Sequence, residues 1–292
     1  MHKNNGEIQI GVGLRHAHYE EALASTDLVD FVEVHSENFY AEGGLTTDLL
    51  NTIADKYSVS LHSTGLGLGS AVGMPAYFLL QLKELVNRID PILVSDHASF
   101  AWSSWQGKAV HMGDLLPLSF HEQSLDVLCE NVEKAQDVLQ RQLLVENLSS
   151  YIFFDEDTYT ETEFLTQLSK RTGCGLLVDL NNVLISAYNL AVKEPLEFAK
   201  QWLDSVPVEA VKEIHLAGHT KPAVGNLIID DHSKPVNEEC WNLFEYSVQH
   251  FGNIPTLIEW DNDLPSWQRL LEEANTARNI AQKFNSLTVG VI

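Results

Sequence analysis

The chain has 292 residues, 45% of them apolar, which is enough to bury a full core. It carries 18 Lys and Arg against 41 Asp and Glu, and this net charge of −23 argues against a nucleic-acid-binding protein. No apolar run is long enough to span a bilayer, and the start lacks the basic-then-apolar pattern of a signal peptide. We therefore expect a cytoplasmic protein that does not enter a membrane. The three cysteines are widely spaced, so we interpret Cys129, Cys174 and Cys240 as small buried residues rather than disulfide partners.

Short β-rich runs recur along the chain, each followed by a longer amphipathic segment. The predicted strands span 8–14, 31–36, 59–64, 92–97, 143–147, 175–181, 211–218 and 255–261. The segments between them place apolar residues every three or four positions, which is the period of an α-helix. The predicted helices span 18–26, 46–57, 76–89, 124–140, 161–173, 194–205, 237–251 and 266–284. Gly173 is expected to end one of them.

This alternation of strands and helices, in a chain of this length, is typical of a (β/α)8 barrel. No linker, repeat or low-complexity segment marks a boundary, so we expect one barrel domain over residues 1–292. An open doubly wound sheet is the alternative, but no G-x-G-x-x-G follows a strand. The glycine-rich stretch 65–70 lacks the lysine of a phosphate-binding loop, and we interpret it as a flexible connection.

Ligand-type side chains end most of the later predicted strands. They are His62, His97, Glu146, Asp179, His215 and Glu259. The active sites of (β/α)8 barrels lie where the strands end. One such residue is more often a structural group, but a whole ring of buried, unpartnered groups would cost on the order of several kcal/mol each. A cluster of cations explains the ring economically, and a set of imidazoles and carboxylates without cysteine favours iron, zinc or manganese.

The stretch 213–235 gathers further groups of this kind between two apolar runs. It contains His215, His219, Asp230, Asp231 and His232. Asp230 and His232 are two residues apart, so they share one face in an extended chain. A polar loop with solvated side chains is the alternative interpretation.

Seven motifs resemble, in the same order, those of the multinuclear non-haem iron-dependent oxidase family. Its better-known members include the methanobactin-biosynthesis oxidase and related enzymes that act on ribosomally made peptides. The motifs are HSENFY (35–40), LHSTGLGLGS (61–70), VSDHASFAW (94–102), VENLSSY (145–151), GLLVDLNNVLISAYN (175–189), EIHLAGH (213–219) and LIEWD (257–261). The resemblance runs from Gly11 to about Asp261. The family is similar in fold to the xylose-isomerase-like barrels, which include the trinuclear-zinc apurinic endonucleases.

The resemblance implies a cofactor of two to three iron ions, with zinc or manganese as alternatives. The implied ligands are His62, His97, Glu146, Asp179, Asn182, His215, Asp230, His232 and Glu259. One ion takes the two early histidines and a bridging Glu146, and a second shares Glu146 with Asp179, His215 and Glu259. A third takes Asn182, Asp230 and His232. The endonucleases have a histidine where Asn182 stands, and an amide binds metals more weakly, so the third site is expected to be the weakest.

The resemblance also implies an activity: oxidation by O2 of cysteine residues in a ribosomally made precursor peptide. A small partner protein that presents the peptide is expected with it. The same ligands would equally serve a metal-dependent hydrolase or isomerase of this barrel class. A metal-binding module that recruits a partner is the non-catalytic alternative.

Other polar residues have weaker claims. Glu33, His35 and Glu37 alternate on one face, either orienting ligands or forming buried hydrogen bonds. Asp261 is a candidate for orienting a ligand or handling a proton. Asp96 is expected to point away from the site. The remaining residues considered are Asn147, His219 and Asp231 as substitutes if the register differs by one, Trp102 and Trp105 as loop or pocket-wall residues, and His2, His111, His121 and His250 as surface or loop histidines.

Overall fold

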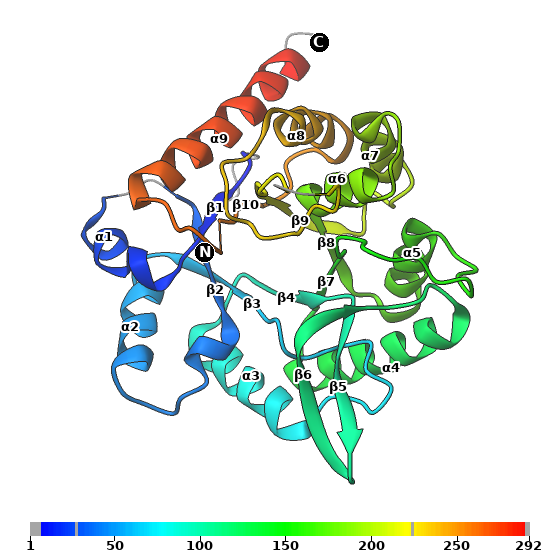
Figure 1. The fold of residues 1–292 in the computed structure, drawn as a ribbon. Coiled ribbons are helices and arrows are strands. Elements are labelled where there is room, and N and C mark those ends of the chain that lie inside the picture. Colours follow the sequence, from blue (N-terminus) through cyan, green and yellow to red (C-terminus); the bar gives the residue numbers. More distant parts are fainter. Residues whose placement is uncertain (1–6, 27–28, 223–224, 290–292) are drawn as a thin grey trace.

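The computed structural model describes residues 7–26, 29–222 and 225–289, and its parallel strands close into a barrel (Figure 1). The barrel strands are β1 (Ile10–Gly13), β2 (Phe31–His35), β3 (Ser58–His62), β4 (Leu93–His97), β7 (Leu144–Glu146), β8 (Gly175–Asp179), β9 (Val211–Leu216) and β10 (Thr256–Ile258). They neighbour one another in that order, and β10 pairs back onto β1. The predicted (β/α)8 barrel is confirmed, and every predicted strand falls on one of these strands.

Helices surround the barrel on the outside (Figure 1). They are α1 (Tyr19–Ala24), α2 (Leu45–Ala54), α3 (Ala76–Ile89), α4 (Glu122–Leu139), α5 (Glu161–Thr172), α6 (Leu180–Asn189), α7 (Pro195–Asp204), α8 (Glu238–Phe251) and α9 (Trp267–Val289), with short 3-10 helices at His16–His18 and Ser36–Phe39. The amphipathic pattern decides how they pack: α3 buries Leu79, Leu82 and Leu85 on one side. Gly173 ends α5 with a φ of 69°, as expected for a helix C-terminus.

Helix α6 was not predicted. The run 175–181 was interpreted as one strand, whereas β8 ends at Asp179 and α6 begins at Leu180. The Asp179 side chain accepts a hydrogen bond from the backbone N–H of Asn182 at 2.6 Å and so caps the new helix. Residues 180–187 are all buried, so this helix lacks the one-sided apolar pattern that reveals a surface helix.

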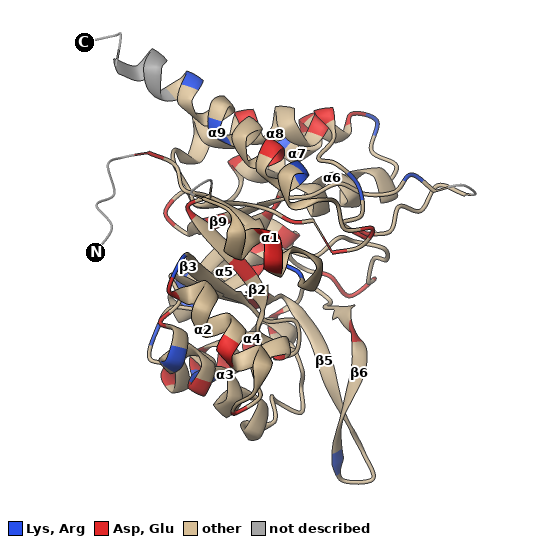
Figure 2. Ribbon diagram, turned by 90° about the vertical axis from the view of Figure 1, so that its left-hand side faces the viewer, with Lys and Arg blue, Asp and Glu red and all other residues tan. Residues whose placement is uncertain are grey.

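A two-stranded hairpin was also missed. Strands β5 (Ser99–Trp105) and β6 (Lys108–Pro117) pair antiparallel outside the barrel and project from its body (Figure 2). The turn consists of Gln106 and Gly107, both with positive φ (49° and 75°), which suits a two-residue hairpin turn. Most of β6 is exposed, so neither strand shows strong alternation of apolar and polar residues.

Two sequence-based expectations have a structural counterpart. All three cysteines are buried and unbonded. Over residues 7–26, 29–222 and 225–289, no helix combines the length and apolarity needed to cross a membrane. Acidic side chains are spread over the helices and loops around the barrel (Figure 2).

Candidate metal centre

The parallel register places the strand-end side chains side by side at one mouth of the barrel. His97 at the end of β4 pairs with Glu146 at the end of β7, and Asp179 at the end of β8 pairs with His215 in β9. Glu259 directly follows β10, and its backbone N–H donates to Leu216 O in β9 at 2.9 Å. Each of these side chains is buried, so they form a polar layer within the mouth.

A first group contains His62, His97 and Glu146. The Nε2 atoms of His62 and His97 lie 3.4 and 3.2 Å from the same oxygen, Oε2 of Glu146. Ser95 Oγ, 2.7 Å from His62 Nδ1, fixes the orientation of that ring. Burial raises the pKa of Glu146 to about 8, whereas the pKa of His97 rises to about 9 because Glu146 and Asp96 outweigh its burial. Three ligand atoms within 4.8 Å of one another can hold a cation.

A second group shares Glu146 with Asp179, His215 and Glu259, again with one ligand atom from each within 4.8 Å of the others. His215 Nδ1 lies 2.9 Å from Glu259 Oε2 and 3.9 Å from Glu146 Oε1. Burial raises the pKa of Asp179 to about 7. For Glu259, His215 and His232 outweigh burial and hold the pKa well below its usual value. Glu146 faces both groups and is thus placed to bridge two ions.

The residues predicted for a third ion lie next to the second group. His232 Nε2 is 2.7 Å from Asp230 Oδ1 and 3.8 Å from Asp179 Oδ2. Asn182, in the first turn of α6, donates from Nδ2 to Asn147 O at 3.1 Å, while its Oδ1 has no partner among the residues that the structure describes. These three residues and most of the first two groups line one cavity of about 160 Å³.

Asp230 and His232 belong to the loop after β9 and not to a strand, and both side chains nevertheless line the same cavity. The loop returns to the barrel because Gly218 and Lys234 pair at its base. A Cβ at residue 218 would clash with the carbonyl oxygen of Pro235, so only glycine permits this approach. His232 itself has a φ of 40°, which turns its side chain into the cavity.

Three atoms in and beside this cavity test whether the residues fit a metal. Within the described part of the chain, Glu146 Oε2, Asp179 Oδ2 and Asn182 Oδ1 are buried and have no hydrogen-bond partner. Buried polar atoms are ordinarily paired, and orphaned carboxylate and amide oxygens are costly. Cations would satisfy all of them, so the residues present fit a multinuclear centre of oxygen and nitrogen ligands.

Arg15 is the main site residue that the sequence analysis missed. Its guanidinium is buried and lies 3.1 Å from Glu259 Oε1 and 2.7 Å from Asp261 Oδ1. Asp261 in turn lies 3.2 Å from His232 Nδ1. Arg15 and His232 help to lower the pKa of Asp261 against the effect of its burial. The position of Arg15 in the sequence could have indicated its place in the site, because it comes just after β1 and the other site residues lie at or after the ends of their strands.

Two carboxylates lie on the other side of His215. Its Nε2 is 3.6 Å from Glu33 Oε1 and 3.8 Å from Glu213 Oε1, and both glutamates are fully buried. Glu213 was not considered in the sequence analysis. Its alternation with His215 along β9 was the signal, because residues two apart on a strand share one face.

Glu33, His35 and Glu37 do not share one environment. His35 lines the metal-site cavity, with Nε2 3.6 Å from Asp261 Oδ1, whereas Glu33 lies inside the barrel. Glu37 accepts from Ser63 Oγ and Thr64 N at 2.7 and 2.9 Å, because the chain turns into a 3-10 helix at Ser36.

The remaining polar candidates make contacts outside the metal groups or at their edge. Asp96 accepts hydrogen bonds from the backbone N–H groups of Leu66 and His97. Asn147 is hydrogen-bonded to the backbone of Asp179, and His219 to the side chain of Asn181. Asp231 lines the cavity. Trp102 is buried and donates to Gly65 O at 2.8 Å, while Trp105 is exposed at the hairpin end. His111 is exposed, His121 caps α4, His250 is partly exposed on α8, and His2 lies outside the described residues.

Comparisons with known proteins identify the family of this chain. A model of the RiPP precursor modification enzyme family MbnB/TglH/ChrH matches residues 9–282. A UPF0276 protein from Vibrio vulnificus (strain YJ016) is 42% identical over 93% of this chain and 91% of its own length. A UPF0276 protein from Caulobacter vibrioides (strain NA1000 / CB15N) is 43% identical over 92% of both chains.

Solved structures share the fold at low sequence identity. A xylose isomerase domain containing protein from Salmonella typhimurium LT2 has a TM-score of 0.61 at 13% identity, covering 96% of this chain and 100% of the other. Endonuclease IV from Thermus thermophilus has a TM-score of 0.57 at 14% identity, covering 94% of this chain and 99% of the other. The barrel is therefore xylose-isomerase-like, and these two proteins inform the fold alone.

Proposed function

The chain belongs to the MbnB/TglH/ChrH family of RiPP precursor modification enzymes, and we propose that it is a multinuclear iron-dependent oxidase. In this proposal it uses O2 to modify cysteine residues of a ribosomally made peptide. The observation that carries the proposal is the sharing of Glu146 between two buried groups of metal-ligand type. A carboxylate that faces both groups is the feature that a multinuclear centre requires.

The ligand atoms suggest how the ions would be distributed. His62 and His97 with Glu146 would hold one ion, and Asp179, His215 and Glu259 would hold a second beside the same carboxylate. Asn182, Asp230 and His232 would hold a third. Asp230 is the most exposed of the nine proposed ligands, with 18% of its side chain accessible, so the third site is expected to lose its ion most readily.

Iron would supply the capacity to bind a cysteine thiolate and to exchange electrons with O2. The protein's own residues would orient the ligands and limit water. His62 and His97 are nearly fully buried, and Ser95 holds the ring of His62, so these residues would keep the first ion largely out of contact with solvent. Asp261, held by Arg15 and 28% exposed, lines the cavity and would accept a hydrogen bond from the incoming peptide.

A small partner protein that presents the peptide is part of the proposal. The hairpin β5–β6 supports it, because Trp105 and Met112 are 71% and 52% exposed on a projecting element. Exposed apolar side chains of this size often mark interaction surfaces.

The test supplies the iron-loaded chain with O2 and a cysteine-containing precursor peptide that is encoded beside its gene. The reaction is run with and without a small protein that is also encoded beside this gene. We expect oxygen consumption that depends on the peptide and a change in peptide mass confined to cysteine-containing fragments. A variant of the peptide with serine in place of cysteine is the matched control. Oxygen consumption equal for both peptides would contradict the proposal, and so would hydrolysis of the peptide without oxygen uptake.

A further inference from the structure

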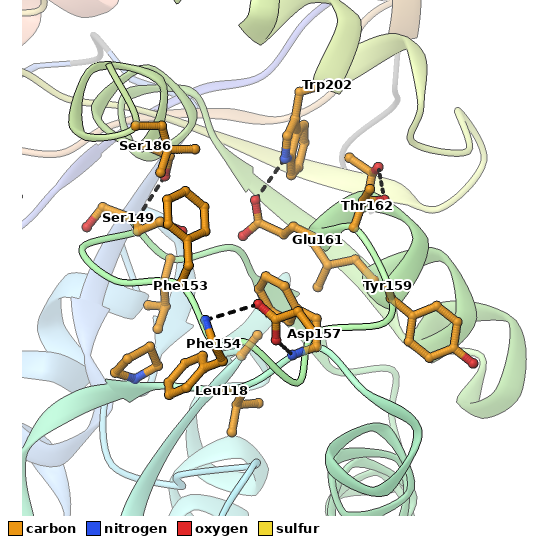
Figure 3. A pocket seen from close by; sticks show the side chains of 18 of the residues that line it. Leu118, Ser149, Phe153, Phe154, Asp157, Tyr159, Glu161, Thr162, Ser186 and Trp202 are labelled. Carbon is orange, nitrogen blue, oxygen red and sulfur yellow. Dashed lines mark hydrogen bonds between the residues drawn. The ribbon is translucent and has the colours of Figure 1, made fainter. Parts of the chain in front are cut away.

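A second, larger cavity lies outside the proposed metal centre. Its volume is about 420 Å³, and it is lined by residues of α5, α6, α7, the loop that joins β7 to α5 and the segment between β6 and α4; Figure 3 shows the side chains that line it. Its walls are mostly apolar and include Leu118, Phe120, Phe153, Phe154, Leu165 and Phe198. Cavities of this size and lining are typical of sites for small ligands or single large side chains.

One carboxylate in this apolar cavity is not fully used by the protein. Glu161 points toward Trp202, whose Nε1 donates to Glu161 Oε2 at 2.8 Å (Figure 3). Among the described residues, this is the one hydrogen bond that the side chain of Glu161 makes, and the cap of α5 is formed by Thr160 and Glu163 instead. Burial raises the pKa of Glu161 to about 7, and the hydrogen bond from Trp202 offsets this only in part.

The other acidic residue of the cavity has a structural task. Asp157 accepts from Ser119 Oγ and Phe120 N at 2.8 and 2.6 Å, and it also accepts from Phe154 N. These bonds shape the loop. Of the two carboxylates, Glu161 is therefore the one with an oxygen left for a ligand, and a ligand that ends in a hydrogen-bond donor would complete it.

The cavity adjoins the proposed metal centre. Leu148, two residues after Glu146, lines both cavities. Tyr151, on the same loop, accepts at its hydroxyl from Ser149 Oγ at 2.8 Å and from Asp230 N at 2.9 Å. A substrate peptide that reaches the proposed metal centre would therefore pass the larger cavity, beside which the side chain of Phe153 is 71% exposed.

We propose that this cavity binds an apolar side chain of the peptide substrate that ends in a hydrogen-bond donor, such as tryptophan or tyrosine, with the donor on Glu161. That the occupant belongs to a peptide rests on the proposed function. The cavity volume fits one aromatic side chain, and the unfilled acceptor selects a donor over an apolar end. Glu161 and Asp157 together disfavour an acidic side chain.

The test measures binding of three acetylated and amidated tripeptides, Gly-Trp-Gly, Gly-Phe-Gly and Gly-Asp-Gly, to the complete chain by ligand-observed NMR. We expect the tryptophan peptide to bind about fivefold more tightly than the phenylalanine peptide, because one additional hydrogen bond has about that worth. The aspartate peptide should not bind. Equal affinities for the tryptophan and phenylalanine peptides, or no binding of either, would overturn the proposal.

Two variants place the binding in this cavity. Gln201→Trp, an exposed lining residue of α7, should fill the cavity and weaken binding at least about tenfold, whereas its neighbour Lys200→Trp should not. Glu161→Gln should reduce the preference for tryptophan to within about twofold, because the amide oxygen remains on Trp202 and the NH2 group faces the ligand. Unchanged affinity in Gln201→Trp would locate the binding elsewhere and refute the assignment.

The same measurement separates this proposal from the proposed function. His215→Ala alters the metal centre and leaves the cavity walls intact, so it should bind the tryptophan peptide as tightly as the unmodified chain. Binding without oxidation would leave the cavity assignment standing while the oxidase proposal fails. Oxidation of a precursor peptide without any tripeptide binding would support the oxidase proposal and refute the cavity assignment.

Discussion

Nδ1 of His215 lies 2.9 Å from Oε2 of Glu259, and both side chains are buried within the mouth of the barrel. The pair joins two neighbouring strands of the barrel, β9 and β10, at the point where Glu146 also approaches. Such a contact brings a carboxylate and an imidazole into range of one ion. On the opposite side, Nε2 faces Glu33 and Glu213, which would orient the ring as carboxylates do behind metal-bound histidines.

Replacing His215 with alanine should therefore remove metal without unfolding the chain. We expect the iron content to fall by about one ion per chain and peptide oxidation to be lost, since a ligand is removed from a centre whose carboxylates remain. Metal analysis together with circular dichroism checks this. His219→Ala is the matched control, because His219 is buried nearby but contacts Asn181 outside the ligand groups. Full iron retention in His215→Ala would show that the ligand assignment is wrong.

The shared position of Glu146 leads to a graded prediction. Glu146→Gln should reduce the iron content by about two ions per chain, because its two oxygens face both ligand groups. Asp230→Asn should reduce it by about one, because Asp230 lies beside His232 at the edge of the cavity. Mass spectrometric metal analysis of the two variants, prepared in parallel, gives the comparison. Equal losses in both would exclude a bridging role for Glu146.

Asp261 should affect the rate of reaction more than the metal. Asp261→Asn keeps the size of the side chain but removes its negative charge and one of the two acceptor oxygens that face Arg15 and His232. If Asp261 binds the substrate rather than supporting the metal, the rate of oxidation should fall on the order of 100-fold with iron content unchanged. Rate and iron content are measured on one preparation. A loss of iron that matches the loss of rate would instead make Asp261 a residue that supports the ligands.

The gathering of these side chains at one mouth of the barrel could be predicted from the sequence because each lies at or beside the end of an apolar strand. His62, His97 and Glu146 stand in a fixed relation to a β-rich run, and parallel strands bring such positions together. The loop residues Asp230 and His232 could be identified as a pair, but their approach to Asp179 depends on the close passage at Gly218. That passage is a tertiary contact and leaves no local pattern.

The features that the sequence did not predict each lack a recognisable local pattern. Helix α6 is buried on all sides, so its sequence shows no amphipathic period. Arg15 and Glu213 were overlooked because basic or acidic residues beside a strand are usually solvated, whereas here they are covered by the barrel. The cavity around Glu161 is assembled from three helices and a loop, and no single segment of the sequence indicates it.

Glu161 provides a prediction about stability and pH. Burial raises its pKa from 4.5 to about 7, so the folded chain holds a proton that the unfolded chain releases between these values. This contribution to stability is lost as the pH rises from about 4.5 to about 7. The Glu161→Gln variant has no carboxyl group to ionise at this position. Its free energy of unfolding should therefore increasingly exceed that of the unmodified chain over this range, by on the order of 2 kcal/mol at pH 8.

Urea unfolding at pH 5 and pH 8 measures this difference. Glu156→Gln is a suitable control, since Glu156 is exposed on the same loop and its replacement should change the stability equally at both pH values. A constant difference between Glu161→Gln and the unmodified chain would show that Glu161 does not titrate with folding.

The central claim is that the buried ligand groups form a multinuclear iron centre. It is tested most directly by the iron content of the chain after purification without oxygen, combined with a Mössbauer spectrum. We predict two to three iron ions per chain, with a spectrum of at least two magnetically coupled sites, because Glu146 faces two ligand groups. A chain that contains zinc alone, or a single iron, and takes up no further iron under these conditions would contradict the account.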